Sequence, residues 1–142
     1  MTRVDFHFNA PDKGSYACRL VRKIFRSGHQ AVVWHEDESE LAAFDKQLWT
    51  FAQHEFIPHV MHDHALASET PVVLACRDLD TDHHDVIVNL GAVPPPVFGR
   101  FERLIEIVTT ATADKEAARE RWRFYRDRGY AMTRHDLSAT RA

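Results

Sequence analysis

Arginine and aromatic side chains are concentrated in one segment, ARERWRFYRDRG, at residues 118–129. A guanidinium presents a planar set of N–H donors that matches a carboxylate or a phosphate, and an aromatic ring beside it offers an apolar surface. If the segment is helical, one face spanning about 80° carries four cations and an indole: Lys115, Arg119, Trp122, Arg123 and Arg126. This face suits an anion joined to a hydrophobic group, such as the C-terminus of an acidic peptide.

A charged helical face is often no more than a solvated surface. Two features favour binding here. Glu120 points away from the cationic face, which therefore lacks an acid at i,i+4 spacing, and an exposed Trp122 between arginines lowers solubility unless a partner covers it. The other side of the helix is expected to pack on a sheet through Phe124 and Tyr125, with Arg121 and Arg128 at its edges.

Histidine clusters raise a different possibility, because histidine is the commonest transition-metal ligand. One cluster comprises His54, His59, His62 and His64, and the other places His83 and His84 beside Asp82 and Asp85. The pair His62-x-His64 could chelate, but neither HExxH nor another recognised zinc spacing occurs. We expect solvated or capping histidines in loops and no metal or catalytic residues. The alternative is a His-dependent metal-binding enzyme on a nucleotide-fold scaffold.

Strands that alternate with helices indicate an α/β fold, with a mostly parallel sheet flanked by helices. The expected strands cover residues 2–8, 29–34, 71–76, 85–90 and 104–109. The expected helices cover residues 13–26, a segment beginning at 36–39, a short turn near 97–101, and residues 113–128, which Gly129 ends. Neither GxGxxG nor a P-loop motif follows the first strand, so the expected fold is Rossmann-like without a nucleotide-binding glycine motif and needs no cofactor.

Length and composition suit one globular domain over residues 1–142. The formal net charge of -3 argues against wrapping nucleic acid, so we expect no direct sequence-specific nucleic-acid binding. Cys18 and Cys76 form no CxxC pair, the first residues are not a signal peptide, and no apolar run approaches the length of a bilayer span. We therefore expect a cytoplasmic protein with reduced thiols and no membrane association.

Four stretches of the sequence resemble the chi subunit family of bacterial DNA polymerase III holoenzyme, part of the clamp-loader complex. They are RVDFHF at residues 3–8, the run from Glu36 to Trp49, Phe56 to His59, and ARERWRFYR at residues 118–126. The resemblance covers most of the chain and implies a single chi-like α/β domain over residues 1–142. It also implies a non-catalytic connector between proteins.

Chi-like proteins bind the acidic C-terminal tail of single-stranded-DNA-binding protein, which ends in a phenylalanine with a free carboxylate. The resemblance implies that Arg119 takes this carboxylate and that Lys115 and Arg123 supply surrounding positive charge. It also implies that Val108 and Trp122 contact the phenylalanine ring. Chi-like proteins commonly have a tyrosine at the position of Trp122.

A second surface of chi-like proteins binds the psi subunit to form a heterodimer. The stretch LWTFAQHEFIPH at residues 48–59 groups large apolar side chains, and the resemblance favours Trp49 and Phe56 for the psi-binding surface, together with Leu48 and Ile57. Each of these residues could instead belong to a helix end and a short strand packed into the core. We expect psi to be the permanent partner and the tail the exchangeable one.

Overall fold

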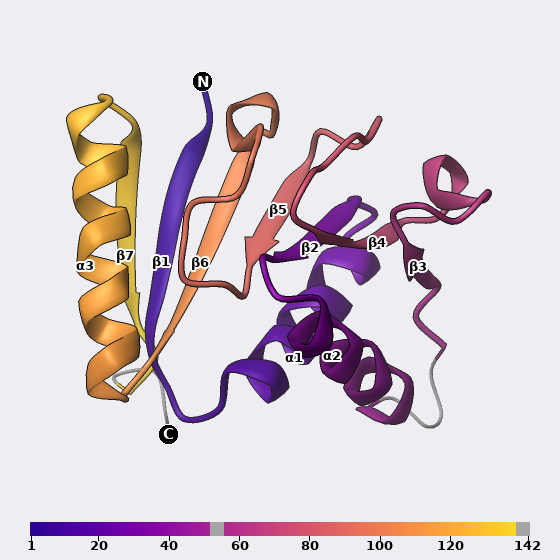
Figure 1. Ribbon diagram of the computed structural model, residues 1–142, viewed down its shortest axis with the longest axis horizontal. Helices are drawn as coiled ribbons and strands as arrows, with labels where there is room; N and C mark the ends of the chain where they lie inside the picture. The colour runs from indigo at the N-terminus through magenta and orange to yellow at the C-terminus, as the bar shows by residue number, and fades with distance from the viewer. Residues whose placement is uncertain (52–55, 139–142) are drawn as a thin grey trace.

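Seven strands, all paired in parallel, form one sheet in the computed structural model, which describes residues 1–51 and 56–138. In chain order the strands are β1 (Arg3–Ala10), β2 (Ala31–His35), β3 (His59–Met61), β4 (Val72–Cys76), β5 (Val86–Asn89), β6 (Arg103–Thr109) and β7 (Ala131–Asp136). The helices are α1 (Lys13–Arg26), α2 (Glu38–Phe51) and α3 (Thr112–Asp127), with short 3-10 helices η1 (Ala67–Glu69) and η2 (Phe98–Arg100). The order across the sheet is β3-β4-β2-β5-β6-β1-β7 (Figure 1).

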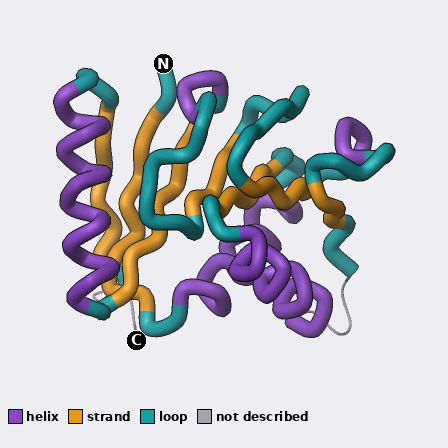
Figure 2. The backbone as a smooth tube through the Cα atoms, in the orientation of Figure 1, coloured by secondary structure: helices purple, strands orange, loops and turns teal. Residues whose placement is uncertain are grey.

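Helices lie on both faces of this sheet (Figures 1 and 2). The connection from β1 to β2 runs along the sheet in the opposite direction to that from β6 to β7. Because such crossovers are right-handed, their helices must lie on opposite faces. Alternate strand residues accordingly enter two separate cores: Val33 packs with α1 and α2, whereas Val32 belongs to the core that contains Tyr125 of α3. The expected α/β fold with a parallel sheet is confirmed.

Local sequence explains where the main helices begin and end. Helix α1 occupies the expected residues, because the Asp12 side chain accepts a hydrogen bond from the backbone N–H of Ser15 at 3.1 Å and Gly28 follows with a φ of 84°. Helix α3 lies within one residue of the expected limits, and Gly129 follows it with a φ of 80°. None of the described helices has both the length and the apolar character needed to cross a bilayer.

Strand β7 was not expected from the sequence. It pairs on one side only, with β1, and most of its side chains are exposed or half-buried. It therefore lacks the alternation of apolar and polar residues by which half-buried strands are identified. The position of β1 between β6 and β7 brings the first strand of the chain beside the last two (Figure 1).

Candidate functional site

A cleft of about 450 Å³ lies between α3 and the adjoining strands β6, β1 and β7. Helix α3 contributes Lys115, Ala118, Arg119 and Trp122 to its wall. The strands contribute apolar or polar side chains from β1 and β6, and one further cation from β7: Phe6, Phe8, Asn9, Val108, Thr109 and Arg134. The structure thus brings Val108, Lys115, Arg119 and Trp122 together in the wall of one cleft.

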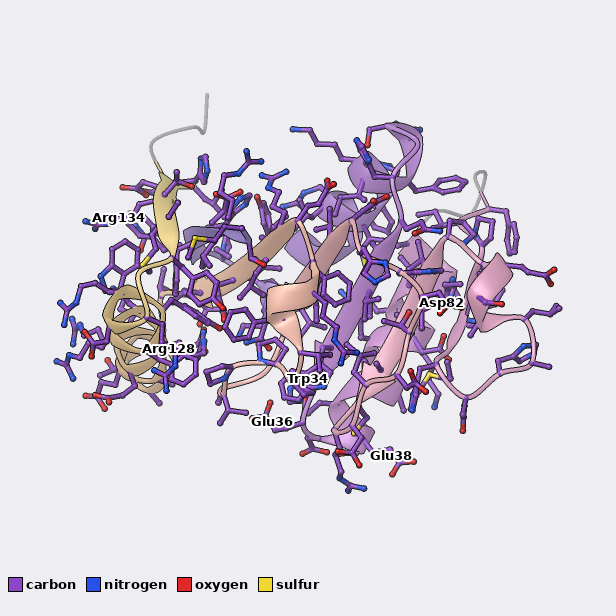
Figure 3. All side chains as sticks on the ribbon, turned by 90° about the horizontal axis from the view of Figure 1, so that it is seen from above. Trp34, Glu36, Glu38, Asp82, Arg128 and Arg134 are labelled. Carbon is purple, nitrogen blue, oxygen red and sulfur yellow. The ribbon has the colours of Figure 1, made fainter. Side chains whose placement is uncertain are left out.

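The floor of the cleft is aromatic. The half-buried Trp122 ring meets the edge of the buried Phe6 ring with centroids 5.2 Å apart and an interplanar angle of 66°. Arg134 lies with its guanidinium carbon 5.2 Å from the Phe8 ring and 5.9 Å from Trp122, within cation–π range. Figure 3 labels Arg134 on β7, beside α3. An apolar ring placed on this floor would be surrounded by cations.

Arg119 and Lys115 are the open cations of the cleft. Both side chains are exposed, and neither makes an ion pair or a side-chain hydrogen bond with any residue in the described part of the chain. An exposed, unpaired guanidinium keeps all five N–H donors available for a carboxylate. Arg119 also lies beside the Trp122 indole, so the cleft pairs an anion-binding group with an apolar surface.

Arg123 does not line this cleft. Its Nη1 atom donates to Glu120 Oε1 at 2.6 Å, and both residues belong to a shallow surface on the outer side of α3. The expectation that the cationic face carries no paired acid is corrected here, because i,i+3 neighbours on a helix reach each other. The cleft is therefore narrower than the face inferred from helical spacing, and Arg134 of β7 takes the place that Arg123 was expected to fill.

A buried polar network holds α3 against the sheet. Glu106 of β6 accepts hydrogen bonds from Arg121 Nε at 2.9 Å, from the Tyr125 hydroxyl at 2.5 Å and from Asn89 Nδ2 at 3.0 and 3.1 Å. Burial, reinforced by the Glu106 carboxylate, raises the pKa of Tyr125 well above its ordinary value, so its hydroxyl remains a donor. Arg121 was expected at an edge of α3, but it is buried at the centre because Glu106 lies beneath it.

The loop after β5 closes over the same network. Arg121 Nη1 donates to the carbonyl of Ala92 at 3.1 Å, and Asn89 Nδ2 donates to the carbonyl of Val93 at 2.9 Å. The Glu36 carboxylate accepts from the backbone N–H of Ala92 at 3.0 and 3.1 Å. The side chains of this network therefore fix the loop as well as the helix.

The first turn of α3 has its own attachment. The Asp114 carboxylate accepts from the backbone N–H of Thr109 at 2.7 Å and from Lys13 Nζ at 3.1 Å. Burial by itself would raise the pKa of Asp114, but the hydrogen bond from Thr109 and the charge of Lys13 outweigh it and hold that pKa below its ordinary value. The first turn of α3, which carries Lys115, is thereby attached to Thr109 at the end of β6.

A second surface presents two aromatic rings near the other edge of the sheet. Trp49 is 52% exposed and Phe56 is 63% exposed, and their ring centroids lie 5.5 Å apart. Leu48 and Ile57, expected on the same surface, are only 2% and 3% exposed because they face the core under α2. The exposed part of the predicted psi-binding surface is therefore reduced to Trp49 and Phe56.

The histidine clusters do not assemble into a metal site in the part of the chain that the structure describes. His59 lies in β3, where its buried ring pairs with Asp45 at 3.0 Å. Its ring centroid lies 4.4 Å from that of Trp49, with the two rings tilted by 48°. His83 lies in a loop, as expected, but it is buried, and its Nε2 atom meets the carbonyl of Thr70 at 2.7 Å, so neither of these two histidines is solvated. His62 and His64 border a cavity of about 250 Å³, and His54 lies outside the described residues.

A different group of metal-ligand side chains does converge. One ligand atom each from Asp5, His7 and His135 lie within 4.8 Å of one another. Sequence reasoning missed this group, and Arg134 as a cleft residue, because β7 was not expected. It missed Phe6 and Phe8 as cleft residues because the strand order, which puts β1 between β6 and β7, was not predicted. The available signal was the alternation in RVDFHF, which places Asp5 and His7 on one side of the strand and the two phenylalanines on the other.

Comparison with solved structures supports the fold alone. The C-terminal domain of the DEAD-box protein Dbp5 superposes with a TM-score of 0.59, over 97% of this chain and 91% of that one, at 12% sequence identity.

Sequence comparison identifies the family. The chain is 35% identical to DNA polymerase III subunit chi of Pseudomonas aeruginosa, over 96% of this chain and 98% of the relative. It is 28% identical to the Haemophilus influenzae subunit chi over 85% of each chain, and 25% identical to the Escherichia coli one over 81% of this chain and 79% of the relative. The family model described as DNA polymerase III chi subunit, HolC, matches residues 1–133. The chain therefore belongs to the chi subunit family of DNA polymerase III, an accessory and non-catalytic subunit in DNA replication.

Proposed function

We propose that this protein links the clamp-loader complex of DNA polymerase III to single-stranded-DNA-binding protein. In this proposal the cleft beside α3 grips the acidic C-terminal tail of that protein, and the surface of Trp49 and Phe56 binds the psi subunit. The observation that carries the proposal is Arg119, an exposed guanidinium with no partner among the described residues, next to the Trp122 ring. The protein would act in the cytoplasm, without reading a nucleic-acid sequence.

The cleft suits a peptide that ends in phenylalanine. The terminal carboxylate would pair with Arg119, and the phenylalanine ring would rest on Phe6, Val108 and Trp122. Lys115 and Arg134 flank this position and would attract the acidic residues that precede the ring. The site is open to solvent, so binding should be salt-sensitive and exchangeable.

The two surfaces lie far apart on the sheet. Strand β3, next to Trp49 and Phe56, is one edge strand, and β7, which carries Arg134, is the other (Figure 1). Two partners could therefore be bound at the same time without contact between them. Exposed aromatic rings in contact with each other are the kind of anchor that dominates a stable protein interface, which supports a longer-lived contact with psi at this edge.

A titration with two labelled peptides tests the proposal. Both have the same acidic sequence ending in phenylalanine, and they differ in a free or an amidated C-terminus. We expect amidation to weaken binding about tenfold to a hundredfold, because a charged hydrogen bond contributes about 1.5–3 kcal/mol. A third peptide with a free C-terminus and one internal acid replaced by its amide controls for net charge and should lose less. Equal binding of the free and amidated peptides would overturn the proposal.

A further inference from the structure

Strand register places three metal-ligand side chains on one face of the sheet. In the parallel pairing of β1 with β7, Asp5 lies beside Thr133 and His7 lies beside His135. Side chains alternate along a strand, so these residues face away from the cleft side, where Phe6 and Phe8 lie. One ligand atom each of Asp5, His7 and His135 fall within 4.8 Å of one another.

His7 leaves one polar atom without a partner. Its side chain is nearly buried, with the residue 8% exposed, and its Nδ1 atom pairs with the Tyr16 hydroxyl. Its Nε2 atom is buried and has no hydrogen-bond partner among the described residues. An unsatisfied buried nitrogen is costly and calls for a physical reason.

Further contacts orient all three side chains. Tyr16 bonds the first nitrogen of His7, which leaves Nε2 as the free ligand atom. Thr133 bonds the Asp5 carboxylate and lies 3.4 Å from His135 Nε2, and Arg103 Nε donates to Asp5 at 2.5 Å. Hydroxyls and charged groups behind the ligands are the usual second layer of a metal site, where they fix ring orientation. A carboxylate accepts up to about four hydrogen bonds, so Asp5 retains lone pairs for a cation.

We propose that Asp5, His7 and His135 form a binding site for a divalent transition metal, with Zn²⁺ as the best match to two imidazoles and one carboxylate. Zinc sites combine such ligands at about 2.0–2.2 Å, and an open fourth position is then filled by water. Tetrahedral bonds of that length hold ligand atoms about 3.4 Å apart, so the cluster must tighten. His135 can supply the movement because it is exposed and lies on an edge strand.

A bound metal would link β1 to the neighbouring strand β7. The residue before His135 is Arg134, whose side chain borders the cleft on the opposite face. The same ion would therefore hold the outer wall of the cleft in place. Arg3 and Arg103 both contact Asp5 and oppose a cation by charge, so affinity should fall short of that of a closed four-ligand site.

Cobalt titration of protein without a histidine tag tests this site. Co²⁺ replaces Zn²⁺ in such sites and reports tetrahedral coordination by its visible absorption. We expect saturable absorption with one equivalent of Co²⁺, displaced by Zn²⁺. His135→Ala should weaken Co²⁺ binding at least about tenfold, as expected for disturbance of a metal's ligand shell. His84→Ala removes another exposed histidine, in a loop outside the cluster, and should leave binding unchanged.

Thermal unfolding provides an independent readout. Excess Zn²⁺ should raise the unfolding midpoint of the unchanged protein and of His84→Ala, because a ligand that binds only the folded state stabilises it. It should not raise the midpoint of His135→Ala or of Asp5→Asn, which keeps the shape of the side chain and removes its charge. Absence of saturable cobalt absorption, or equal binding by His135→Ala, would overturn the site. Either result would leave the proposal of peptide binding by the cleft standing.

Discussion

Two arginines of α3 lie two positions apart and meet opposite surroundings. Arg121 is buried and donates a hydrogen bond to Glu106 of β6, which also accepts one from Tyr125. Arg119 is exposed and pairs with no residue in the described part of the chain. The helix supplies the same side chain in both places. The difference arises beneath the helix, because the sheet offers a carboxylate to one arginine and an apolar cleft to the other.

The energetic consequences differ as well. Arg121 and Glu106 have both left water, so the loss of either would strand the other as an unpaired buried charge. Arg119 keeps its hydration in the free protein, so its removal leaves nothing stranded. One arginine is therefore expected to act on stability and the other on binding, and five experiments can break or sharpen this division.

The largest effect is expected from Arg121→Ala. The substitution leaves Glu106 buried without its cation, which should lower the free energy of unfolding by about 3–5 kcal/mol. Urea-induced unfolding followed by circular dichroism measures this change. Arg121→Met combined with Glu106→Gln removes both charges and should recover much of the loss. A single-variant loss below about 1 kcal/mol would show that the buried pair is not what holds α3.

Arg119→Ala should do the reverse. Binding of the free-carboxylate peptide should weaken by about 1.5–3 kcal/mol, while stability changes by less than about 0.5 kcal/mol. Fluorescence anisotropy and urea unfolding of the same sample measure both quantities. Arg126→Ala is the matched control, because Arg126 is exposed on the same helix and pairs with Asp127 at 3.3 Å outside the cleft.

The same peptide assay, run beside a psi-binding assay, tests whether the two proposed partner surfaces are separate. Trp49→Ala should weaken psi binding and leave the peptide titration unchanged, and Arg119→Ala should spare psi binding. Loss of both activities in either variant would contradict the separation.

A smaller effect distinguishes Lys115 from Arg123. Lys115 lines the cleft, whereas Arg123 is engaged by Glu120 on the outer side of the helix. Lys115→Ala should weaken peptide binding by about 0.2–1 kcal/mol and flatten its salt dependence, as expected for an exposed ion pair. Arg123→Ala should change neither quantity. A larger loss for Arg123→Ala would restore the wider binding face inferred from helical spacing.

The smallest effect is expected in the pH dependence of stability, through the carboxylate of Asp114. The folded-state pKa of Asp114 is depressed, so its contribution to stability is present above its ordinary value of 3.8 and is lost as pH falls through the lower folded value. Asp114→Asn should therefore reduce stability near neutral pH and flatten its decline below about pH 4. Unfolding curves between pH 2 and about 7 test this, with Asp127→Asn as an exposed control on the same helix. Parallel declines for both variants would exclude the predicted role.

Sequence reasoning could place the helices and strands whose apolar side chains recur at regular spacing. Helix α3 was predicted within one residue at each end because its apolar positions recur and glycine ends it. The same spacing could not show that Arg121 is buried, since that depends on Glu106 lying under it in a neighbouring strand. Nor could it separate exposed Trp49 from buried Leu48, because adjacent helical positions differ only by what packs against them.

The placement of β1 between two late strands affects how the molecule forms on the ribosome. Arg3 finds its neighbours at Arg103 and Ala131, so the first strand must wait for roughly 100 residues of further synthesis, or about 5–20 s at typical elongation rates. Until then the apolar side chains of Phe6 and Phe8 lack α3 and the two late strands that pack around them in the folded protein. Chaperones or early collapse must then keep this strand from aggregating. The cleft beside α3, which draws on both ends of the chain, should be among the last features to form.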